Sequence, residues 1–113
     1  MCDEKTLKRI LSQTVNKFED IYGSALKAVV LYGSYARGDY DNESDIDVAA
    51  IVDIDRSDLN RYLDEIVRFS SDIDLEYGIM LSPSILSLAD FEKYKADLPY
   101  YANIEAEGVV LNA

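Results

Sequence analysis

Two short apolar runs constrain this chain most, because a polar loop rich in turn-forming residues connects them. Residues 28–32 have the sequence AVVLY, and residues 45–52 have the sequence DIDVAAIV. Their length and their content of β-branched residues predict two buried β-strands. The second run alternates only at its beginning, so we expect Asp45 and Asp47 on one face of a strand whose remainder is buried on both faces.

Helical periodicity precedes and follows this pair of strands. Residues 3–22 repeat apolar side chains at helical spacing and end before Gly23, which predicts an amphipathic helix. Residues 57–77 show the same spacing, with Ser57 as the expected N-cap and Gly78 as the C-terminal stop. The two strands are therefore expected between two long helices.

The C-terminal third of the chain predicts shorter elements. Residues 79–86 are expected to form a third strand, and Pro83 within it indicates an edge position or a bulge. Residues 87–90, Ser-Leu-Ala-Asp, have the pattern of a capping box that opens a helix. A further helical segment is expected over residues 99–108, and residues 109–111 are a candidate last strand.

The order of these elements and the chain length predict the fold class. Helices mixed with strands in this order indicate an α/β (α+β) fold, in which a small β-sheet is packed with helices. A length of 113 residues predicts one domain that spans residues 1–113. The apolar runs are far too short to cross a bilayer, and the N-terminus lacks the regions of a signal peptide. We therefore expect a cytoplasmic protein without a membrane segment.

The composition excludes several kinds of chemistry. The chain has no His and one Cys, Cys2, which removes Ser-His-Asp and Cys-His catalysis, His-ligated zinc and an internal disulfide. It has 11 Lys and Arg residues against 22 Asp and Glu residues, a net charge of −11. Because nucleic-acid affinity rests mainly on Lys and Arg at phosphates, we expect no direct binding of nucleic acid. The remaining chemistry depends on carboxylates and metal ions.

One of the four Asp-x-Asp pairs in the chain lies in a distinctive frame. Gly33 and Ser34 follow the first apolar run, and after ten further residues Asp45-Ile-Asp47 opens the second. Gly33 allows a close approach of the backbone, and Ser34 with the following amides can hold phosphate oxygens. Two carboxylates on one face of a strand can ligate Mg²⁺, which commonly shares oxygen ligands with substrate phosphates. The frame therefore predicts a nucleoside triphosphate site.

Arg37 lies in the same loop and has two alternative partners. Either it reaches the triphosphate, or it pairs with the acids Asp39 and Asp41. The surroundings are strongly acidic, because residues 38–58 contain eight of the acids and one Arg. A triphosphate is therefore expected to enter only with Mg²⁺, and a protein partner is expected to be relatively basic and to bind more weakly as salt rises.

The stretch GSYARGDYDNESDID resembles the signature of the DNA polymerase β-like nucleotidyltransferase superfamily. It is particularly similar to the minimal nucleotidyltransferases, small proteins typically encoded beside a HEPN-domain toxin as its antitoxin. The resemblance implies a mixed-sheet nucleotidyltransferase fold, in which Gly33 and Ser34 grip the triphosphate of ATP while Asp45 and Asp47 bind Mg²⁺. It further implies two metal ions that assist attack of a hydroxyl on the α-phosphorus, with transfer of AMP to a tyrosine of the toxin.

A third carboxylate is the open point of this site. The superfamily places it on a later strand beside the Asp-x-Asp pair, and Asp74 or Glu76 would supply it if their segment were a strand. Helical spacing and the stop at Gly78 favour a helix there, which leaves Ser82 and Ser84 as the polar residues of the third strand. Without the third acid, the base that activates the attacking hydroxyl is missing.

Three functions follow from these alternatives. The first is an adenylylating antitoxin, and the second is the subunit of an enzyme that adenylylates a small molecule such as an aminoglycoside. The third is a degenerate nucleotide-binding module that neutralises a partner by contact alone. The sequence leaves open whether the chain also forms a homodimer.

Overall fold

The computed structural model describes residues 3–41 and 43–112, so Cys2 lies outside the described residues. The elements over these ranges follow one another as α1 (Glu4–Tyr22), the 3-10 turn η1 (Gly23–Ala25), β1 (Leu26–Tyr32), α2 (Ser34–Arg37), β2 (Ile46–Val52), the 3-10 helix η2 (Arg56–Tyr62), α3 (Leu63–Tyr77), β3 (Leu81–Ser87), α4 (Leu88–Tyr94), α5 (Pro99–Glu107) and β4 (Val109–Val110). None of the helices in the described ranges is long and apolar enough to cross a membrane.

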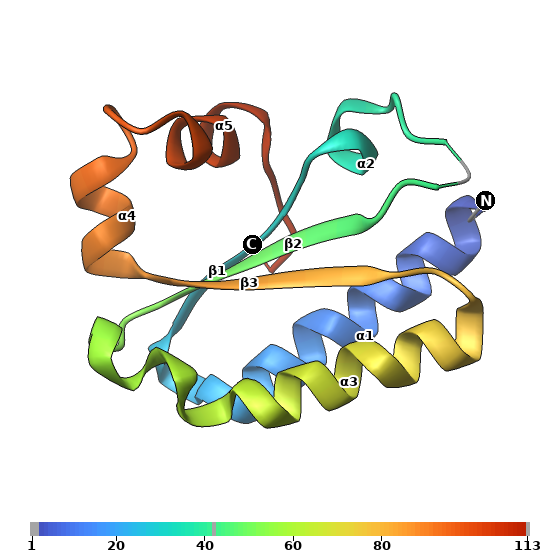
Figure 1. Ribbon diagram of the computed structural model, residues 1–113, viewed down its shortest axis with the longest axis horizontal. Helices are drawn as coiled ribbons and strands as arrows, with labels where there is room; N and C mark the ends of the chain where they lie inside the picture. The colour runs from blue at the N-terminus through green and yellow to red at the C-terminus, as the bar shows by residue number, and fades with distance from the viewer. Residues whose placement is uncertain (1–2, 42, 113) are drawn as a thin grey trace.

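The strands form one mixed sheet in the order β3-β2-β1-β4 (Figure 1). β1 pairs antiparallel with β2 and with β4, whereas β2 and β3 run parallel. A parallel pair needs a crossover connection, which η2 and α3 supply. The predicted fold class, a small mixed sheet packed with helices, is therefore confirmed.

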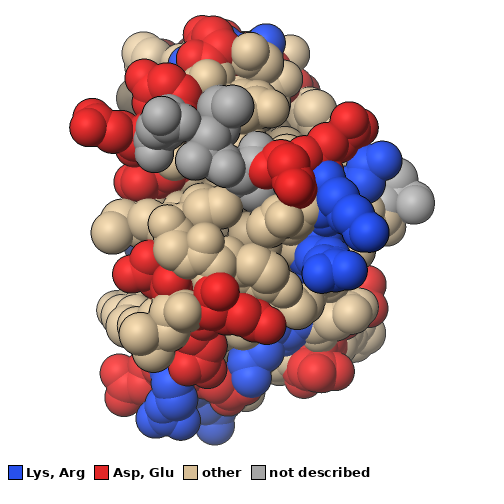
Figure 2. All heavy atoms as spheres, turned by 90° about the vertical axis from the view of Figure 1, so that its right-hand side faces the viewer, with Lys and Arg blue, Asp and Glu red and all other residues tan. Residues whose placement is uncertain are grey.

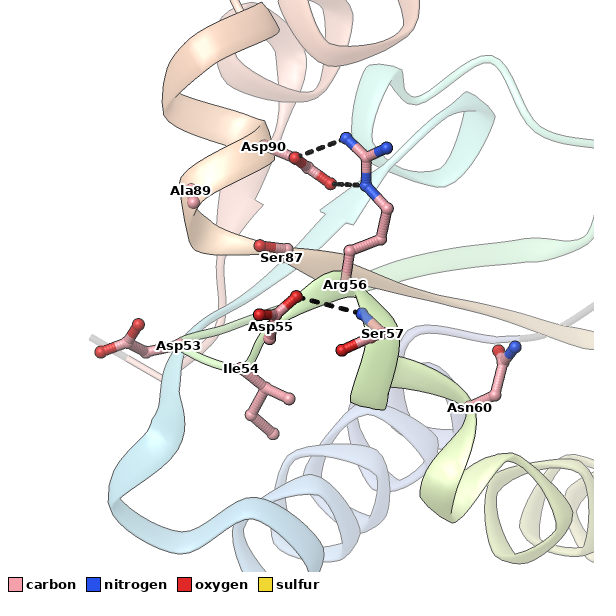
Figure 3. A pocket seen from close by; sticks show the side chains of 9 residues that line it. All are labelled: Asp53, Ile54, Asp55, Arg56, Ser57, Asn60, Ser87, Ala89 and Asp90. Carbon is pink, nitrogen blue, oxygen red and sulfur yellow. Dashed lines mark hydrogen bonds and ion pairs between the residues drawn. The ribbon is translucent and has the colours of Figure 1, made fainter.

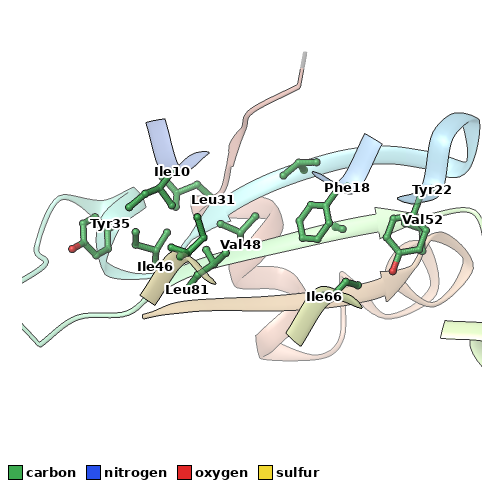
Figure 4. Close-up of a cluster of buried hydrophobic side chains, with 13 residues drawn as sticks. Ile10, Phe18, Tyr22, Leu31, Tyr35, Ile46, Val48, Val52, Ile66 and Leu81 are labelled. Atoms are coloured by element: carbon green, nitrogen blue, oxygen red, sulfur yellow. The ribbon is translucent and has the colours of Figure 1, made fainter. Parts of the chain in front are cut away.

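Helices cover both faces of this sheet, and each face has its own apolar core. Figure 1 shows α1 and α3 on one side and α2, α4 and α5 on the other. The α1 and α3 side buries Ile10, Phe18, Val48 and Ile66 (Figure 4). The opposite side has a smaller core, whose buried members are Val30, Ala49, Ile51, Leu86, Phe91 and Ile104. Successive residues of β2 thus contribute to different cores, as predicted for a strand buried on both faces.

The segment before α3 differs from the prediction. Residues 56–62 form the 3-10 helix η2, and the α-helix begins only at Leu63. The cap of η2 is Asp55, whose carboxylate accepts the backbone N–H of Ser57 at 3.2 Å, so the prediction of Ser57 as N-cap was wrong. An Asp side chain that accepts the amide two residues later stabilises a tight turn, and the chain enters the helical region through this turn.

β3 confirms one local prediction, and α4 contradicts another. β3 is an edge strand, which explains how Pro83 is accommodated without a backbone N–H. Ser87 is the N-cap of α4, but within the described residues its side chain makes no capping hydrogen bond. Asp90, the second member of the predicted capping box, binds Arg56 instead through two hydrogen bonds of 2.8 Å. The partner from a distant segment is favoured because a guanidinium gives the carboxylate two hydrogen bonds and an opposite charge, whereas a cap gives it one bond from an uncharged N–H.

Candidate functional site

The beginning of β2 places the carboxylates of Asp45 and Asp47 on one face of the sheet. Ile46 is fully buried toward α1 and α3, and its backbone N–H donates to the carbonyl of Met80 at 2.9 Å. Because side chains alternate along a strand, the residues on either side of Ile46 project to the opposite face. Asp47 lies opposite Tyr32 of β1 and opposite Ser82 of β3.

The turn after β1 brings the backbone against Asp47. Gly33 has φ 76° and ψ −154°, a conformation that side-chain-bearing residues rarely adopt. A Cβ atom on Gly33 would overlap the carboxylate of Asp47. Glycine is therefore required at position 33 for two reasons: its backbone conformation, and the lack of a Cβ atom that would meet Asp47. The backbone of the turn approaches the Asp47 carboxylate closely, as predicted for Gly33.

Ser34 begins α2, a single helical turn that follows this glycine. The carbonyl of Ser34 accepts the N–H of Gly38 at 2.9 Å, and Gly38 closes the turn in the left-handed conformation. Tyr35 anchors the turn, because its buried ring joins the core and stacks on Tyr40 with centroids 4.2 Å apart. The first amides of a helix lack intrahelical acceptors, so the backbone at Ser34 suits an anionic oxygen.

The electrostatics around Asp47 fit a divalent cation. Burial raises the pKa of Asp47 above its ordinary value, and the negative charge of Asp45 raises it further, while Arg37 opposes both effects. Two close carboxylates, one of them half-buried, repel each other, and a bound cation would remove that repulsion. Carboxylate oxygens are also the ligands that Mg²⁺ prefers. The residues present therefore fit Mg²⁺.

Among the residues that the structure describes, no third carboxylate joins this pair. Asp74 and Glu76 lie in α3, as the helical spacing predicted, and α3 covers the other side of the sheet. In the described ranges, no group of three or more Asp, Glu, His or Cys residues is placed to hold a metal ion. The position opposite Asp47 belongs to Ser82, whose hydroxyl donates to Asp45 Oδ2 at 3.3 Å.

Arg37 shows its predicted pairing with the nearby acids in part. Its guanidinium binds Asp39 at 3.2 Å and Glu107 of α5 at 3.3 Å, and these hydrogen bonds raise its pKa. Asp41 instead accepts the backbone N–H of Glu43 at 2.9 Å. Glu107 is 70 residues away in the chain, so no local pattern identified it as a partner.

A group of hydroxyls extends the site along the same face of the sheet. The hydroxyl of Tyr32 lies 3.2 Å from the Ser84 hydroxyl and 3.1 Å from that of Tyr100 in α5. Burial raises the pKa of Tyr32. The sequence marked Ser82 and Ser84 as the polar residues of β3, but it did not identify Tyr32, although Tyr32 directly precedes Gly33.

Acidic and basic side chains are both exposed at the end of the molecule that carries this site. Figure 2 shows one cluster of basic side chains at the right of this face and a second one at its lower edge, with acidic side chains scattered among uncharged ones. The acids of the loop, Asp39, Asp41 and Glu43, are exposed. Lys5, Lys8 and Arg9 belong to the first turns of α1. The predicted excess of negative charge beside Asp45 and Asp47 is thus present at the surface.

A cavity of about 770 Å³ lies at the other end of β2 (Figure 3). Its lining includes Asp53, Asp55 and the ion pair between Arg56 and Asp90. None of the five predicted site residues, Gly33, Ser34, Arg37, Asp45 and Asp47, lines it. The cavity is therefore separate from the carboxylate pair, and two of its acids already have partners, Asp55 as a cap and Asp90 in the ion pair.

Similar proteins agree with the nucleotidyltransferase signature. Residues 11–105 match the family model described as "Nucleotidyltransferase domain". "Putative protein adenylyltransferase MJ0604" of Methanocaldococcus jannaschii is 33% identical over 98% of this chain and 99% of its own length. "Putative protein adenylyltransferase MJ0141" of the same organism is 37% identical over 67% of this chain and 75% of its own length.

A solved structure agrees with the fold. It is described as "a putative nucleotidyltransferase from Sulfolobus solfataricus", and it superposes with a TM-score of 0.57 at 22% identity, over 90% of this chain and 78% of that chain. MJ0604 aligns with nearly the whole chain, and the solved structure shares its architecture. This chain therefore belongs to the nucleotidyltransferase domain family.

Proposed function

We propose that this chain is a Mg²⁺-dependent adenylyltransferase that transfers AMP from ATP to a hydroxyl group of a partner protein. The observation that carries the proposal is the carboxylate pair of Asp45 and Asp47 beside the Gly33 turn. The names of the Methanocaldococcus relatives support an adenylyl donor and a protein acceptor. Gly33, Ser34 and Arg37 belong to the turn directly after β1, Asp47 belongs to β2, and Asp45 directly precedes β2.

Each of these residues has a role in the proposed reaction. Asp45 and Asp47 would hold two Mg²⁺ ions, which supply charge neutralisation at the phosphates and activation of the attacking oxygen. Ser34 and the first amides of α2 orient the triphosphate, while Gly33 keeps that turn close to Asp47. Arg37 exchanges Glu107 for a phosphate oxygen, because its guanidinium is exposed and a bidentate phosphate contact suits it.

We propose a basic HEPN-domain toxin as the partner, with this chain as its antitoxin. The net charge of −11 favours association with a basic surface, and the exposed acids beside the site would face such a partner. The acceptor hydroxyl, proposed to be that of a tyrosine, is then presented by the partner. Salt should weaken the association, since exposed charges are screened.

A second candidate function is neutralisation by contact alone, with bound nucleotide but without transfer. The observation that favours it is Ser82, which occupies the position opposite Asp47 on the third strand. Within the described residues no acid takes this position. A hydroxyl that already donates to Asp45 is a poor general base, so the acceptor would have to be activated by the metal ions or by the partner.

The test is a transfer assay with labelled ATP, Mg²⁺ and the protein encoded by the neighbouring gene. We expect the label on that protein with the native chain and its loss with Asp45→Ala. Asp53→Ala is the matched control, because it removes a carboxylate just beyond the other end of the same strand. Stable association without any label would support neutralisation by contact alone, and labelling that persists in Asp45→Ala would refute the proposed site.

A further inference from the structure

Five side-chain hydroxyls belong to the elements that surround the carboxylate pair, but they differ in exposure. Ser34, Tyr32, Ser82 and Ser84 are all partly buried. Tyr100 of α5 is 44% exposed. An acceptor must present its oxygen to a bound nucleotide, so exposure favours Tyr100 over the other four as a nucleophile.

Tyr100 is linked to the catalytic face by a continuous series of contacts. Its hydroxyl lies 3.1 Å from that of Tyr32, and their rings meet edge to face with centroids 6.0 Å apart. Tyr32 lies opposite Asp47 in the sheet, and the charge of Asp47 acts on the Tyr32 hydroxyl. The Tyr32 hydroxyl also reaches Ser84, which is two residues after Ser82 on the same face of β3.

A second contact holds α5 over the same region. Glu107, in the last turn of α5, binds Arg37 at 3.3 Å. α5 is thus attached to the site at both ends, through Tyr100 near its beginning and Glu107 at its end. These two contacts hold the Tyr100 hydroxyl close to the site without a partner protein.

We propose that Tyr100 is an acceptor of this chain's own adenylyl transfer, so that the protein modifies itself. The Tyr100 oxygen attacks the α-phosphorus of ATP, and a bond from this oxygen to phosphorus forms. The bond from the α-phosphorus to the oxygen that bridges to the β-phosphate breaks, and pyrophosphate leaves. The phenolic proton passes to solvent water, because the Tyr100 side chain is at the surface, with 44% of the residue exposed. The inference rests on the proposed function, because it uses the same nucleotide site.

Tyr101 offers a matched control on the same helix. Its ring packs against Phe91 and Tyr94, with centroids 6.1 Å and 6.0 Å away, and so turns toward α4. Tyr101 is also less exposed than Tyr100. A Tyr→Phe change at either position removes one hydroxyl and keeps the ring, so the two variants differ mainly in which hydroxyl is lost.

The experiment incubates the purified full chain with ATP and Mg²⁺ and without any other protein. Intact mass spectrometry is expected to show the addition of one AMP, and peptide mapping is expected to place it on Tyr100. Tyr100→Phe should reduce the modification at least about 10-fold, while Tyr101→Phe should change it less than about 2-fold; Asp45→Ala should abolish it. The fraction modified per unit time should not depend on protein concentration, because the acceptor lies in the same chain as the site.

The outcomes separate this inference from the proposed function. Modification of another residue, or undiminished modification of a Tyr100→Phe variant that melts like the native chain, would overturn the role of Tyr100. A chain that labels its partner but never itself would overturn self-modification and leave the proposed function intact. A chain that labels neither, although it binds ATP and Mg²⁺, would overturn both.

Discussion

The two ends of β2 carry the same Asp-x-Asp pattern in different surroundings. At the beginning of the strand, Asp47 is half-buried against the Gly33 turn, and the charge of Asp45 acts on it. Just beyond the other end, Asp53 is exposed, and the Asp55 carboxylate accepts a backbone N–H as the cap of η2. An identical pair of acids is thus a candidate metal site at one end and part of a turn at the other.

The two ends of β2 also differ in whether a basic side chain of the protein neutralises the acids there. The cavity at the far end holds the bidentate pair between Arg56 and Asp90, so a cation of the chain is already in place there. At the near end, Arg37 is bound to Asp39 and Glu107, and it contacts neither Asp45 nor Asp47 in the hydrogen bonds of the described residues. The difference teaches that an uncompensated, partly buried charge indicates a ligand site better than the volume of a cavity does.

Removal of one carboxylate at each end should produce the largest contrast. Asp45→Ala is expected to reduce AMP transfer by about 100-fold or more, because a metal ligand is lost. Asp53→Ala is expected to change the rate by less than about 2-fold, since its carboxylate is exposed and remote from the site. Initial rates with labelled ATP measure both, and equal losses in the two variants would contradict the assignment.

A methyl group on either glycine of the loop should separate backbone conformation from contact with Asp47. Gly33→Ala is expected to destabilise the fold by about 3 kcal/mol, because positive φ and overlap with the Asp47 carboxylate add together. Gly38→Ala also has positive φ, but its Cβ would meet open space, so about 1 kcal/mol is expected. Urea unfolding measures the stabilities, and titration with ATP and Mg²⁺ should show weakened binding for Gly33→Ala alone.

Loss of the cap at the far end should affect stability without affecting transfer. Asp55→Ala is expected to cost about 1 kcal/mol, the usual value for an N-cap carboxylate. Asp55→Asn keeps an oxygen acceptor and should retain most of the stability. Thermal unfolding compares the three proteins, and a fall in AMP transfer at a temperature where all are folded would show that the far end also serves the reaction.

The smallest expected effects are those of carboxylate ionisation on fold stability, and they have opposite signs at the two ends of β2. The pKa of Asp47 is raised above its ordinary value of 3.8, so its ionised form destabilises the fold increasingly as pH rises through that window. The pKa of Asp90 is lowered by Arg56, so its ionised form stabilises the fold above 3.8, and this contribution is lost as pH falls through the lowered pKa.

These shifts predict how two matched variants behave. Without Mg²⁺ at pH 7, Asp47→Asn is expected to melt slightly above the native chain and Asp90→Asn slightly below it. Both differences should shrink in strong acid, where the native carboxyl groups are protonated in the folded and the unfolded chain alike. Melting curves between pH 3 and pH 7 measure them, and two shifts of the same sign would remove the electrostatic contrast.

Regular elements and the local site frame were predictable because their signals are local. The spacing of apolar residues predicted a helix over 3–22, and the structure has Glu4–Tyr22. Pro83 correctly indicated the edge strand, and Gly78 correctly ended α3 in the left-handed conformation. The errors lie at capping positions, where Asp55 rather than Ser57 caps η2 through a local turn and Asp90 gained Arg56, 34 positions away, as its partner.

The site residues likewise divide into those predicted from local patterns and those that depend on contacts between distant segments. Gly33 and the two acids at the start of β2, Asp45 and Asp47, were identified from a frame of fixed spacing, since two neighbouring antiparallel strands bring their connected ends together whatever the remainder of the fold does. The contacts of Tyr32 with Tyr100 and of Arg37 with Glu107 join residues 68 and 70 positions apart. Such pairs depend on how α5 packs across the sheet, and no periodicity in the sequence encodes that placement.

The sequence by itself determined the strands, the long helices, the turn at Gly33 and the presence of acids on one face at the start of β2. Backbone preferences and hydrophobic periodicity act over a few residues, so the sequence alone is enough to recognise them. Only the tertiary structure decided how closely the Asp47 carboxylate packs against Gly33, that Ser82 lies opposite Asp47, and that Tyr100 contacts Tyr32. Burial, charge compensation and neighbours across the sheet arise from packing between distant segments, and they distinguish one acidic pair from another.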